Sequence, residues 1–285
     1  MTSIGGFDIT FHGVRGSTPC HGDDIRRYGG NTSCVSVALP EHDPIFFDVG
    51  TGARYFGGHC NSDRPFRGTC LLTHLHWDHL QGLPFFPPLL KSGGQLDIHA
   101  PLQDAGASLH EVFGRSICPP LFPVGLDALP GDLTLRATGD DDFMIGEANV
   151  MSRFIPHVGP TLGYRLEWGG ASVAYLSDHQ QPGVELFEAT DNAKELCRDV
   201  DVLIHDAQYT PEEFIEKTNW GHCTIDYAVW LAAECNVKTL VLFHHDPLHD
   251  DDMLDKLIQA ADESIWADGM NVIGAYEGLV LRVGG

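Results

Sequence analysis

One short segment constrains this chain more than any other: a run of histidines and an aspartate that directly follows an apolar stretch. Residues 70–73 are apolar or β-branched and predict a strand, and His74-Leu-His76-Trp-Asp78-His79 comes next. Because side chains alternate in extended chain, His74 and His76 point to the same side. Asp78 and His79 fall on the following turn, where they can converge with the two histidines on two adjacent cations. The spacing therefore predicts a metal site at a strand end, whereas a lone histidine here would indicate only a polar loop.

Four ligands do not fill two metal sites, and three further candidates follow later expected strands. They are His157, Asp178 and His244. A carboxylate such as Asp178 can bridge two cations and trap a hydroxide between them. Each residue alone could be a surface or capping residue, but together with the first motif they indicate a two-metal site. Imidazole and carboxylate suit zinc and also manganese or iron, so we expect two divalent ions, with zinc the first choice.

Short apolar segments separated by Gly, Pro and Asn fill most of the rest of the chain. Strands are expected at residues 9–14, 33–39, 45–48, 70–73, 96–100, 133–137, 150–155, 162–168, 173–176, 202–205, 240–243 and 280–283. Helices are expected at residues 103–113, 184–197, 225–235 and 251–267, the third with Thr224 as its N-cap. Many strands and few amphipathic helices predict two sheets with helices packed outside. No linker or repeat divides residues 1–285, so we expect a single domain.

The motifs together resemble the metallo-β-lactamase superfamily, and within it the branch of the transfer-RNA 3′-processing endonuclease (RNase Z) and related phosphodiesterases. The resemblance spans nearly the whole chain. It is carried by Asp48-Val-Gly-Thr-Gly, His74-Leu-His76-Trp-Asp78-His79, His157, Ser177-Asp178, His205-Asp206-Ala-Gln-Tyr, Gly221-His222-Cys-Thr and Phe243-His244-His245-Asp-Pro. It implies an α/β (α+β) fold: an αββα sandwich of two mixed β-sheets flanked by helices, with the site at one edge.

The resemblance also implies how the ligands are divided between the two metals. One metal would be held by His74, His76 and His157, the other by Asp78, His79 and His244, and Asp178 would bridge them. Asp48 would orient the ligand loop, although it could equally cap the segment that follows it. His179 and His245 adjoin proposed ligands, but alternation along a strand does not require them to face the metals, so they stay outside the ligand set.

Two further residues bear on the chemistry, because one di-metal scaffold serves lactams, thioesters and phosphoesters. Asp206 and His222 look like an acidic residue and a histidine that lie beside the metals in the phosphodiesterase branch. A leaving alkoxide needs a proton, which His222 could supply as general acid while Asp206 holds its ring in one tautomer. The catalytic set is therefore His222, Asp206 and Asp78, which is also a ligand. Alternatively, His222 caps the helix near residue 225 and Asp206 only ends a strand.

Cys223 departs from the family pattern, which usually has serine at this position. A thiol is a weaker hydrogen-bond donor than a hydroxyl, so loop ordering or substrate contact could differ. Arg15 lies in a glycine-containing loop near the N-terminus. It could contact phosphate, but turn formation explains the glycines almost as well.

Charge narrows the choice of substrate. The chain has 17 basic and 40 acidic residues, a formal net charge of −23, which repels polyanions, and it lacks the extended basic arm of the transfer-RNA enzymes. We therefore predict hydrolysis of a small phosphodiester, a cyclic nucleotide being one candidate, by a metal-bridging hydroxide, with long nucleic acid disfavoured. The alternatives are a transfer-RNA 3′-processing endonuclease or a thioester or lactam hydrolase on the same metals. The complete ligand set argues against a non-catalytic metal-binding module.

Location and assembly are constrained only by general features. The N-terminus shows no basic stretch followed by an apolar run, and no segment is apolar over a membrane-spanning length. The eight cysteines form no C-x-x-C pair, which fits reduced thiols. We expect a cytoplasmic protein with no membrane contact and no structural disulfide. Family relatives are often dimers, which leaves a homodimer open.

Overall fold

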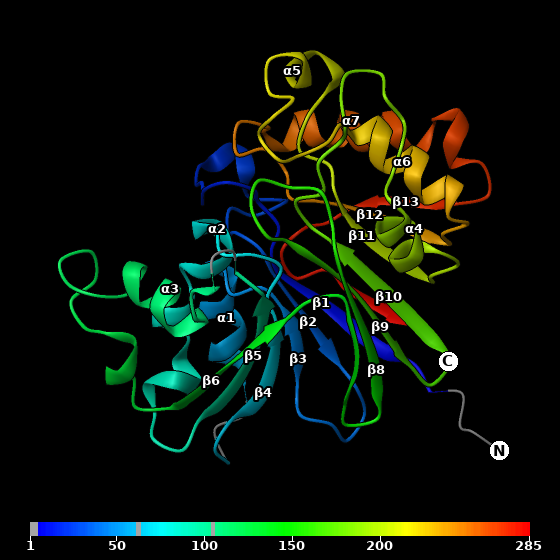
Figure 1. Cartoon of the computed structure of the whole chain (residues 1–285). Coiled ribbons are helices and arrows are strands. Elements are labelled where there is room, and N and C mark those ends of the chain that lie inside the picture. Colours follow the sequence, from blue (N-terminus) through cyan, green and yellow to red (C-terminus); the bar gives the residue numbers. More distant parts are fainter. Residues whose placement is uncertain (1–4, 61–63, 104–105) are drawn as a thin grey trace.

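Two seven-stranded sheets form the centre of the structure, a computed structural model that describes residues 5–60, 64–103 and 106–285 (Figure 1). The first sheet has the order β14 (Val280–Val283), β1 (Phe7–Gly13), β2 (Cys34–Ala38), β3 (Ile45–Phe47), β4 (Arg67–Leu71), β5 (Gln95–Pro101) and β6 (Asp132–Thr138). The second has the order β13 (Asn271–Gly274), β12 (Thr239–Phe243), β11 (Val202–Asp206), β10 (Ala171–Leu176), β9 (Leu162–Trp168), β8 (Ala148–Phe154) and β7 (Asp141–Ile145).

Both sheets are mixed. In the first, the pairs from β14 to β3 are antiparallel and those from β3 to β6 are parallel. In the second, the pairs from β7 to β10 are antiparallel and those from β10 to β13 are parallel. Parallel neighbours end at the same edge of a sheet, so each sheet brings several strand ends together.

Helices α1 (Gly52–His59), α3 (Leu109–Ser116), α4 (Asp191–Cys197), α6 (Ile225–Glu234) and α7 (Asp251–Asp262) pack against the two sheets from outside. The short helices α2 (Trp77–Leu80) and α5 (Pro211–Ile215) lie beyond the strand ends instead (Figure 1). Residues of α1 and α3 share a buried apolar cluster with the first sheet, and residues of α4 and α6 share one with the second. A third cluster fills the space between the sheets. These layers confirm the expected αββα sandwich.

The layer between the sheets is built from alternate residues of each strand. In β1, Phe7, Ile9 and Phe11 are fully buried while the residues between them are partly exposed. Phe11 meets Phe243 of the opposite sheet, with ring centroids 6.1 Å apart. This period of two is the pattern that half-buried strands require, whereas β3, β10 and β11 are buried on both faces and have continuous apolar sequences.

Two strands that the sequence did not predict are β7 and β13. They form the two edges of the second sheet. β7 begins with two acidic residues, Asp141 and Asp142, and none of its side chains is fully buried. Edge strands need no continuous apolar face, and charge on them discourages pairing with other chains. Their sequences therefore lack the alternation on which strand prediction depends.

Helix boundaries differ more than strand boundaries. The helix expected at 184–197 begins only at Asp191, because the Thr190 side chain accepts a hydrogen bond from the Ala193 backbone and caps the helix there. The helix expected at 251–267 ends at Asp262 and is followed by a separate 3₁₀ turn.

The other helices also differ in extent. In the helix expected at 103–113, residues 104–105 lie outside the described residues, and the observed helix α3 spans Leu109–Ser116. The expected helix at 225–235 is confirmed with Thr224 as its cap. Two short helices, α1 and α5, were not predicted. α1 contains three glycines, which lower helix propensity. In the part of the chain that the structure describes, no helix is both long and apolar enough to cross a membrane.

Truncating Phe11 tests the packing between the sheets. Replacing Phe11 by Ala leaves a cavity against Phe243, and we expect the free energy of unfolding to fall by about 3–5 kcal/mol, measured by urea denaturation. Met144→Ala is the control, because that side chain is 56% exposed on β7 and its loss should change the free energy by less than about 0.5 kcal/mol. Equal effects of the two substitutions would contradict this account of the core.

Candidate metal centre

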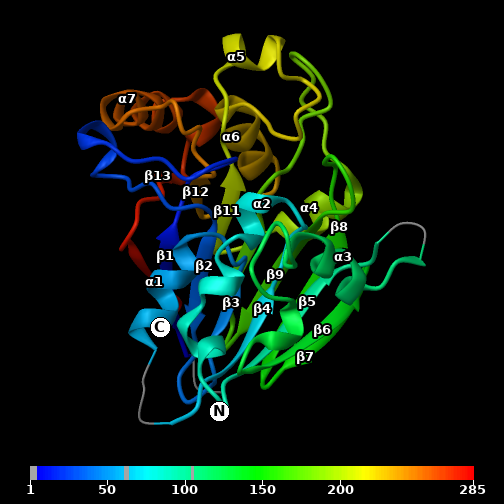
Figure 2. The same ribbon diagram turned by 90° about the vertical axis from the view of Figure 1, so that its left-hand side faces the viewer.

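The predicted ligands converge because the strands that precede them end at one edge of the sandwich. Asp48 follows β3, His74 follows β4, His157 follows β8, Asp178 follows β10, Asp206 ends β11 and His244 follows β12. The short helix α2 carries Asp78 and His79, and both views show it at the upper end of the strands (Figures 1 and 2). Both sheets therefore contribute side chains to one buried cluster.

Three of these residues have a left-handed backbone conformation, which residues other than glycine rarely adopt. Asp48 and Asp178 both have φ of 59°, and His244 has φ of 60°. Each stands directly or one residue beyond a strand end, where the chain must turn sharply while its side chain faces the cluster. Such conformations cost about 1–3 kcal/mol each and persist where the surrounding structure fixes them, typically at functional sites.

The potential ligand atoms form three overlapping groups, each with its atoms within 4.8 Å of one another. The first is His74, His76, His157 and Asp178, the second is Asp78, His79, Asp178 and His244, and the third is Asp178, Asp206, His222 and His244. The first two groups share Asp178 and have the same division as the one that the resemblance implies, and the third shows that Asp206 and His222 adjoin the second.

The donor atoms are spaced as ligands of a shared cation would be. His76 Nδ1 and His157 Nε2 are 3.2 Å apart. Nitrogens at about 2.0–2.1 Å from one tetrahedral ion lie about 3.3 Å from each other. In addition, His74 Nε2 and His79 Nε2 are buried without a hydrogen-bond partner. Buried imidazole nitrogens without partners are costly unless something else fills them, so the residues present fit a divalent metal.

The opposite ring nitrogen of each of four histidines is already engaged. The Nδ1 atoms of His74, His79, His157 and His244 contact Thr73 Oγ1, Asp48 Oδ2, the Gly221 carbonyl and Gln208 Oε1 at 3.0, 2.8, 2.7 and 2.9 Å. When Nδ1 donates, the lone pair of Nε2 is left free for a metal, and the ring is held in one orientation.

Asp48 is itself fixed from both sheets. Thr73 donates to its Oδ1 from the backbone and from the hydroxyl, and the Tyr175 hydroxyl donates to its Oδ2 at 2.8 Å. Ser177 has a similar role, because its hydroxyl donates to Asp178 Oδ1 at 2.7 Å. The roles of Thr73, Ser177 and Gln208 were not predicted. Thr73 and Ser177 directly precede the proposed ligands His74 and Asp178, which is the signal that could have identified them, whereas Gln208 adjoins no proposed ligand in the sequence.

Electrostatics divides the cluster into two parts. Burial is the main cause that lowers the pKa of His74, His76 and His157, the last to about 4, so these rings are neutral and ready to bind a cation. Around His244 burial also acts to lower the pKa, but Asp178 and the other carboxylates outweigh it and raise the pKa to about 10. That half of the cluster is therefore rich in negative charge and attracts positive charge, whether protons or metal ions.

The Asp206–His222 pair lies beside the cluster. His222 Nδ1 donates to Asp206 Oδ2 at 2.8 Å and lies 3.8 Å from Asp178 Oδ2. Thr224, not His222, caps α6, so the alternative reading of His222 as a helix cap is wrong. The Cys223 thiol is buried and donates to the Asp206 carbonyl at 3.1 Å, and burial raises its pKa well above the ordinary value. Cys223 thus supports the loop beside Asp206.

Three other residues considered from the sequence bond elsewhere. His179 contacts His205 at 2.9 Å, and His245 contacts the Ala275 carbonyl at 3.0 Å. Arg15 is fully buried and donates to the backbone carbonyls of Gly29, Asp246 and His249. The idea that Arg15 contacts phosphate is therefore wrong, because its guanidinium instead fastens the N-terminal loop to the segment that follows His244.

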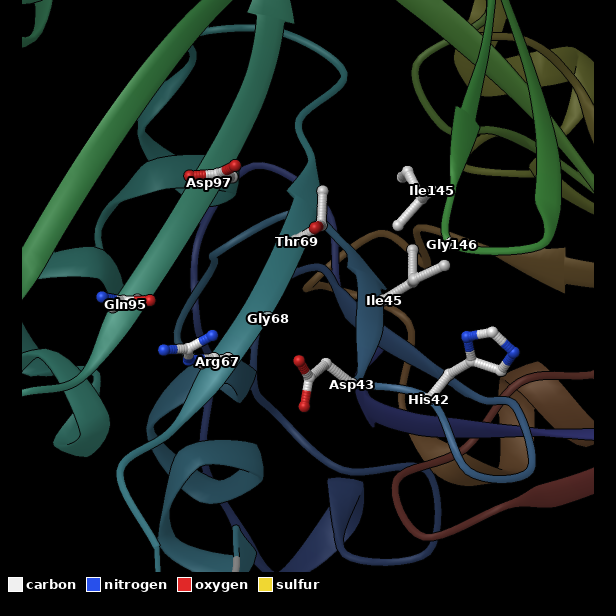
Figure 3. Close-up of a pocket in the computed structure, with 10 residues that line it drawn as sticks. All are labelled: His42, Asp43, Ile45, Arg67, Gly68, Thr69, Gln95, Asp97, Ile145 and Gly146. Atoms are coloured by element: carbon white, nitrogen blue, oxygen red, sulfur yellow. The ribbon is translucent and has the colours of Figure 1, made fainter.

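A polar cavity elsewhere in the molecule does not compete as the site. Figure 3 shows a hollow of about 280 Å³ that includes His42, Arg67 and Asp97. Arg67 is the first residue of β4, whereas the ligand motif follows the last, so the hollow adjoins the opposite end of that strand. None of the predicted ligands lines it.

Comparison with known proteins agrees with this geometry. Residues 68–245 match the family described as the β-lactamase superfamily domain. The chain is 24% identical to the ribonuclease Z of Synechococcus sp. (strain CC9311), covering 84% of this chain and 87% of that protein. It is 25% identical to the ribonuclease Z of Archaeoglobus fulgidus, with 84% and 87% covered.

Solved structures share the fold at lower identity. The metallo-β-lactamase fold protein YhfI of Bacillus subtilis has a TM-score of 0.71 at 17% identity, covering 98% of this chain and 99% of that one. The short form of human tRNase Z has a TM-score of 0.63 at 21% identity, with 96% and 98% covered. A diphosphatase of the PhnP family has a TM-score of 0.66 at 18% identity, with 98% of both chains covered. At such identities the likeness concerns the fold.

Gly221 offers a test of how the cluster is held. It has φ of 96°, and a Cβ there would lie 2.2 Å from the His157 ring, so Gly221→Ala should displace His157. We expect metal affinity to fall about 10–100-fold, the usual cost of disturbing a ligand's support, measured by competition with a chelator. Gly58→Ala is the matched control, since a Cβ at Gly58 meets nothing within 4 Å. Unchanged metal affinity in Gly221→Ala would show that metal binding does not depend on the position of the His157 ring.

Proposed function

The chain belongs to the β-lactamase superfamily and is a metallo-hydrolase with RNase Z-like relatives, and from this premise we propose that it is a two-metal phosphodiesterase acting on a small phosphodiester. A cyclic nucleotide is one candidate substrate. The observation that carries the proposal is the Asp206–His222 pair, because a hydrogen-bonded carboxylate–imidazole pair beside the ligand cluster is equipped to protonate a leaving alkoxide.

We assign the ligands as follows. His74, His76 and His157 would hold one ion, Asp78, His79 and His244 the other, and Asp178 both. When bound, two divalent cations supply a nucleophile from water at neutral pH and polarise the phosphoryl oxygens. The chain's contribution is to keep the imidazoles neutral at one group and to fix each ring through its Nδ1 hydrogen bond. Zinc is the first candidate, and elemental analysis identifies the metals.

His222 would act as the general acid. Its Nδ1 is held by Asp206, so the exchangeable proton for the substrate is carried by Nε2. Asp206 is fully buried, and burial, which acts to raise its pKa, is outweighed by His222, so its pKa is lowered and it stays ionised. An ionised Asp206 accepts the hydrogen bond from His222 Nδ1 and so fixes the tautomer and orientation of that ring.

The transfer-RNA alternative has support of its own. The relatives that match most of the chain are ribonucleases Z, which by their name cleave RNA. Against it stands the net charge of −23, because RNA binding depends on cations that replace counterions. A thioester or lactam hydrolase would use the same metals without an acid at His222. The cytoplasmic location and the homodimer stay predictions.

Replacing His222 by Ala tests the role of the acid. We expect turnover to fall about 10²–10⁴-fold for a cyclic nucleotide, whose leaving alkoxide must be protonated, and far less for bis(p-nitrophenyl) phosphate, whose phenolate leaves without help. Metal content measured in parallel should be unchanged. An equal loss on both substrates, or retained turnover of the cyclic nucleotide, would contradict the assignment.

A substrate panel separates the functions. The metal-loaded enzyme should hydrolyse bis(p-nitrophenyl) phosphate or a cyclic nucleotide. Precursor transfer RNA should be a poor substrate, and its affinity for the enzyme should fall steeply as the salt concentration rises. The measurement is kcat/KM for phosphodiesters, precursor transfer RNA, thioesters and lactams under one set of conditions. Efficient cleavage of precursor transfer RNA, with none of the small phosphodiesters, would overturn the proposal.

A further inference from the structure

A cavity of about 510 Å³ is lined by Trp77 of α2 and by Gln81, which follows α2, and by none of the proposed metal ligands. We call it the α2 cavity. Its aromatic wall is formed by Tyr55, Trp77, Phe85 and Phe122, with Gln81 and Arg54 among its polar residues. Its volume falls in the usual range for small-molecule sites, about 300–1,000 Å³.

The short helix α2 contributes residues both to the cavity and to the candidate metal centre. Asp78 and His79 are buried in the ligand cluster, whereas Trp77 lines the cavity. Gln81, four residues after Trp77, lies on the same face of the helical turn and also lines the cavity. His76 and Trp77 are consecutive and both exposed, so a proposed ligand and a cavity wall are neighbours at the surface.

The N-terminal loop also contacts both the candidate metal centre and the α2 cavity. The Ser17 backbone donates to Asp78 Oδ2 at 2.8 Å, and Pro19, two residues later, lines the cavity. A molecule whose phosphate lies at the metal centre could therefore extend over one turn of α2 and place its other end in the cavity.

The chemistry of the wall indicates what that other end is. Tyr55, Trp77 and Phe85 are about half exposed, at 51%, 54% and 54%, which is unusual for neighbouring aromatic side chains unless they bind something. Flat rings bind flat rings, and the Gln81 amide can bond the edge of a heterocycle. Among the described residues that line the cavity, Arg54 is the one with a charge, and it can stack on or donate to an electron-rich ring.

We infer that the α2 cavity binds the nucleobase of a phosphodiester whose phosphate lies at the candidate metal centre. This inference rests on the proposed function and names the substrate class as nucleotides. A nucleobase joins a flat stacking surface to polar edges, as the mixed wall requires, while a purely aliphatic group would leave Gln81 and Arg54 unused. A free nucleotide and the end of an RNA present the same base, and the substrate panel above separates those sources.

Calorimetric titration of the metal-loaded full chain tests the inference. Adenosine 5′-monophosphate should bind at least about tenfold tighter than ribose 5-phosphate, which has the same phosphate and sugar but no base. The double variant Tyr55→Ala/Phe85→Ala should lose this preference while its affinity for ribose 5-phosphate is unchanged. Leu90→Ala is the control, because Leu90 is 47% exposed nearby but does not line the cavity.

Turnover of bis(p-nitrophenyl) phosphate, measured on the same samples, separates the two ideas. Turnover without a preference for the base, or a preference that survives in the double variant, overturns the inference and leaves the proposed function standing. A base preference that depends on Tyr55 and Phe85, without turnover of any phosphodiester, supports the nucleobase site and overturns the proposed function. If Tyr55→Ala/Phe85→Ala instead changes only the oligomeric state on gel filtration, the cavity is a protein contact and the inference is wrong.

Discussion

Four buried aspartates impose the constraint on which the functional edge of the molecule depends. Asp48, Asp78, Asp178 and Asp206 are at most 5% exposed, and within the described part of the chain their ion pairs are all with histidines. Removing a carboxylate from water costs several kcal/mol unless positive charge and hydrogen bonds compensate. Histidine supplies that charge only when protonated, whereas a divalent cation supplies it and leaves the rings neutral. Metal binding and the stability of this edge are therefore linked.

The same constraint ties the site to the packing of the two sheets. Asp48 belongs to the first sheet, and one of its hydrogen bonds comes from Tyr175 of the second. The Tyr175 ring stacks on Phe47, the residue before Asp48, with centroids 4.6 Å apart. The Tyr175 side chain thus belongs both to the inter-sheet core and to the hydrogen bonds that hold Asp48 beside the candidate metal centre. A change in how the sheets pack would move Asp48 and, through it, the His79 ring.

The metal motif could be read from sequence because its spacing is local. His74 and His76 share a side of extended chain, and Asp78 and His79 follow on one turn, so no tertiary information is needed to bring them together. Most central strands were found for another local reason, because strands buried on both faces, such as β10 and β11, have short continuous apolar sequences. The later proposed ligands, His157, Asp178 and His244, needed the family resemblance as well, because only the fold brings distant strand ends to one edge.

What could not be predicted depends on contacts between distant segments. The edge strands β7 and β13 carry little apolar alternation. The prediction that residues 184–190 are helical was wrong, because Thr190 caps the helix and it begins at Asp191. Apolar periodicity does not reveal where such a cap lies. The role of Arg15 was misjudged for another reason. A lone arginine in a loop resembles a phosphate contact, and only the structure shows that backbone carbonyls from residues 246 and 249 enclose it.

The location of positive charge bears most directly on the conflict between the relatives' name and the small-substrate proposal. Several arginines already pair with carboxylates: Arg26, Arg27, Arg64, Arg136, Arg153, Arg165 and Arg282. Arg15 is buried, so it too is withdrawn from any ligand. Each exposed pair adds little stability, but it neutralises a cation that a polyanion would otherwise meet. With Lys217 and Lys238 also paired, ten of the 17 basic residues are ion-paired or buried within the described part of the chain, which leaves few free cations for a long nucleic acid to contact. Under the proposed function, a single nucleotide needs only the two metals and one stacking surface, and α2 contributes residues to both the candidate metal centre and the α2 cavity.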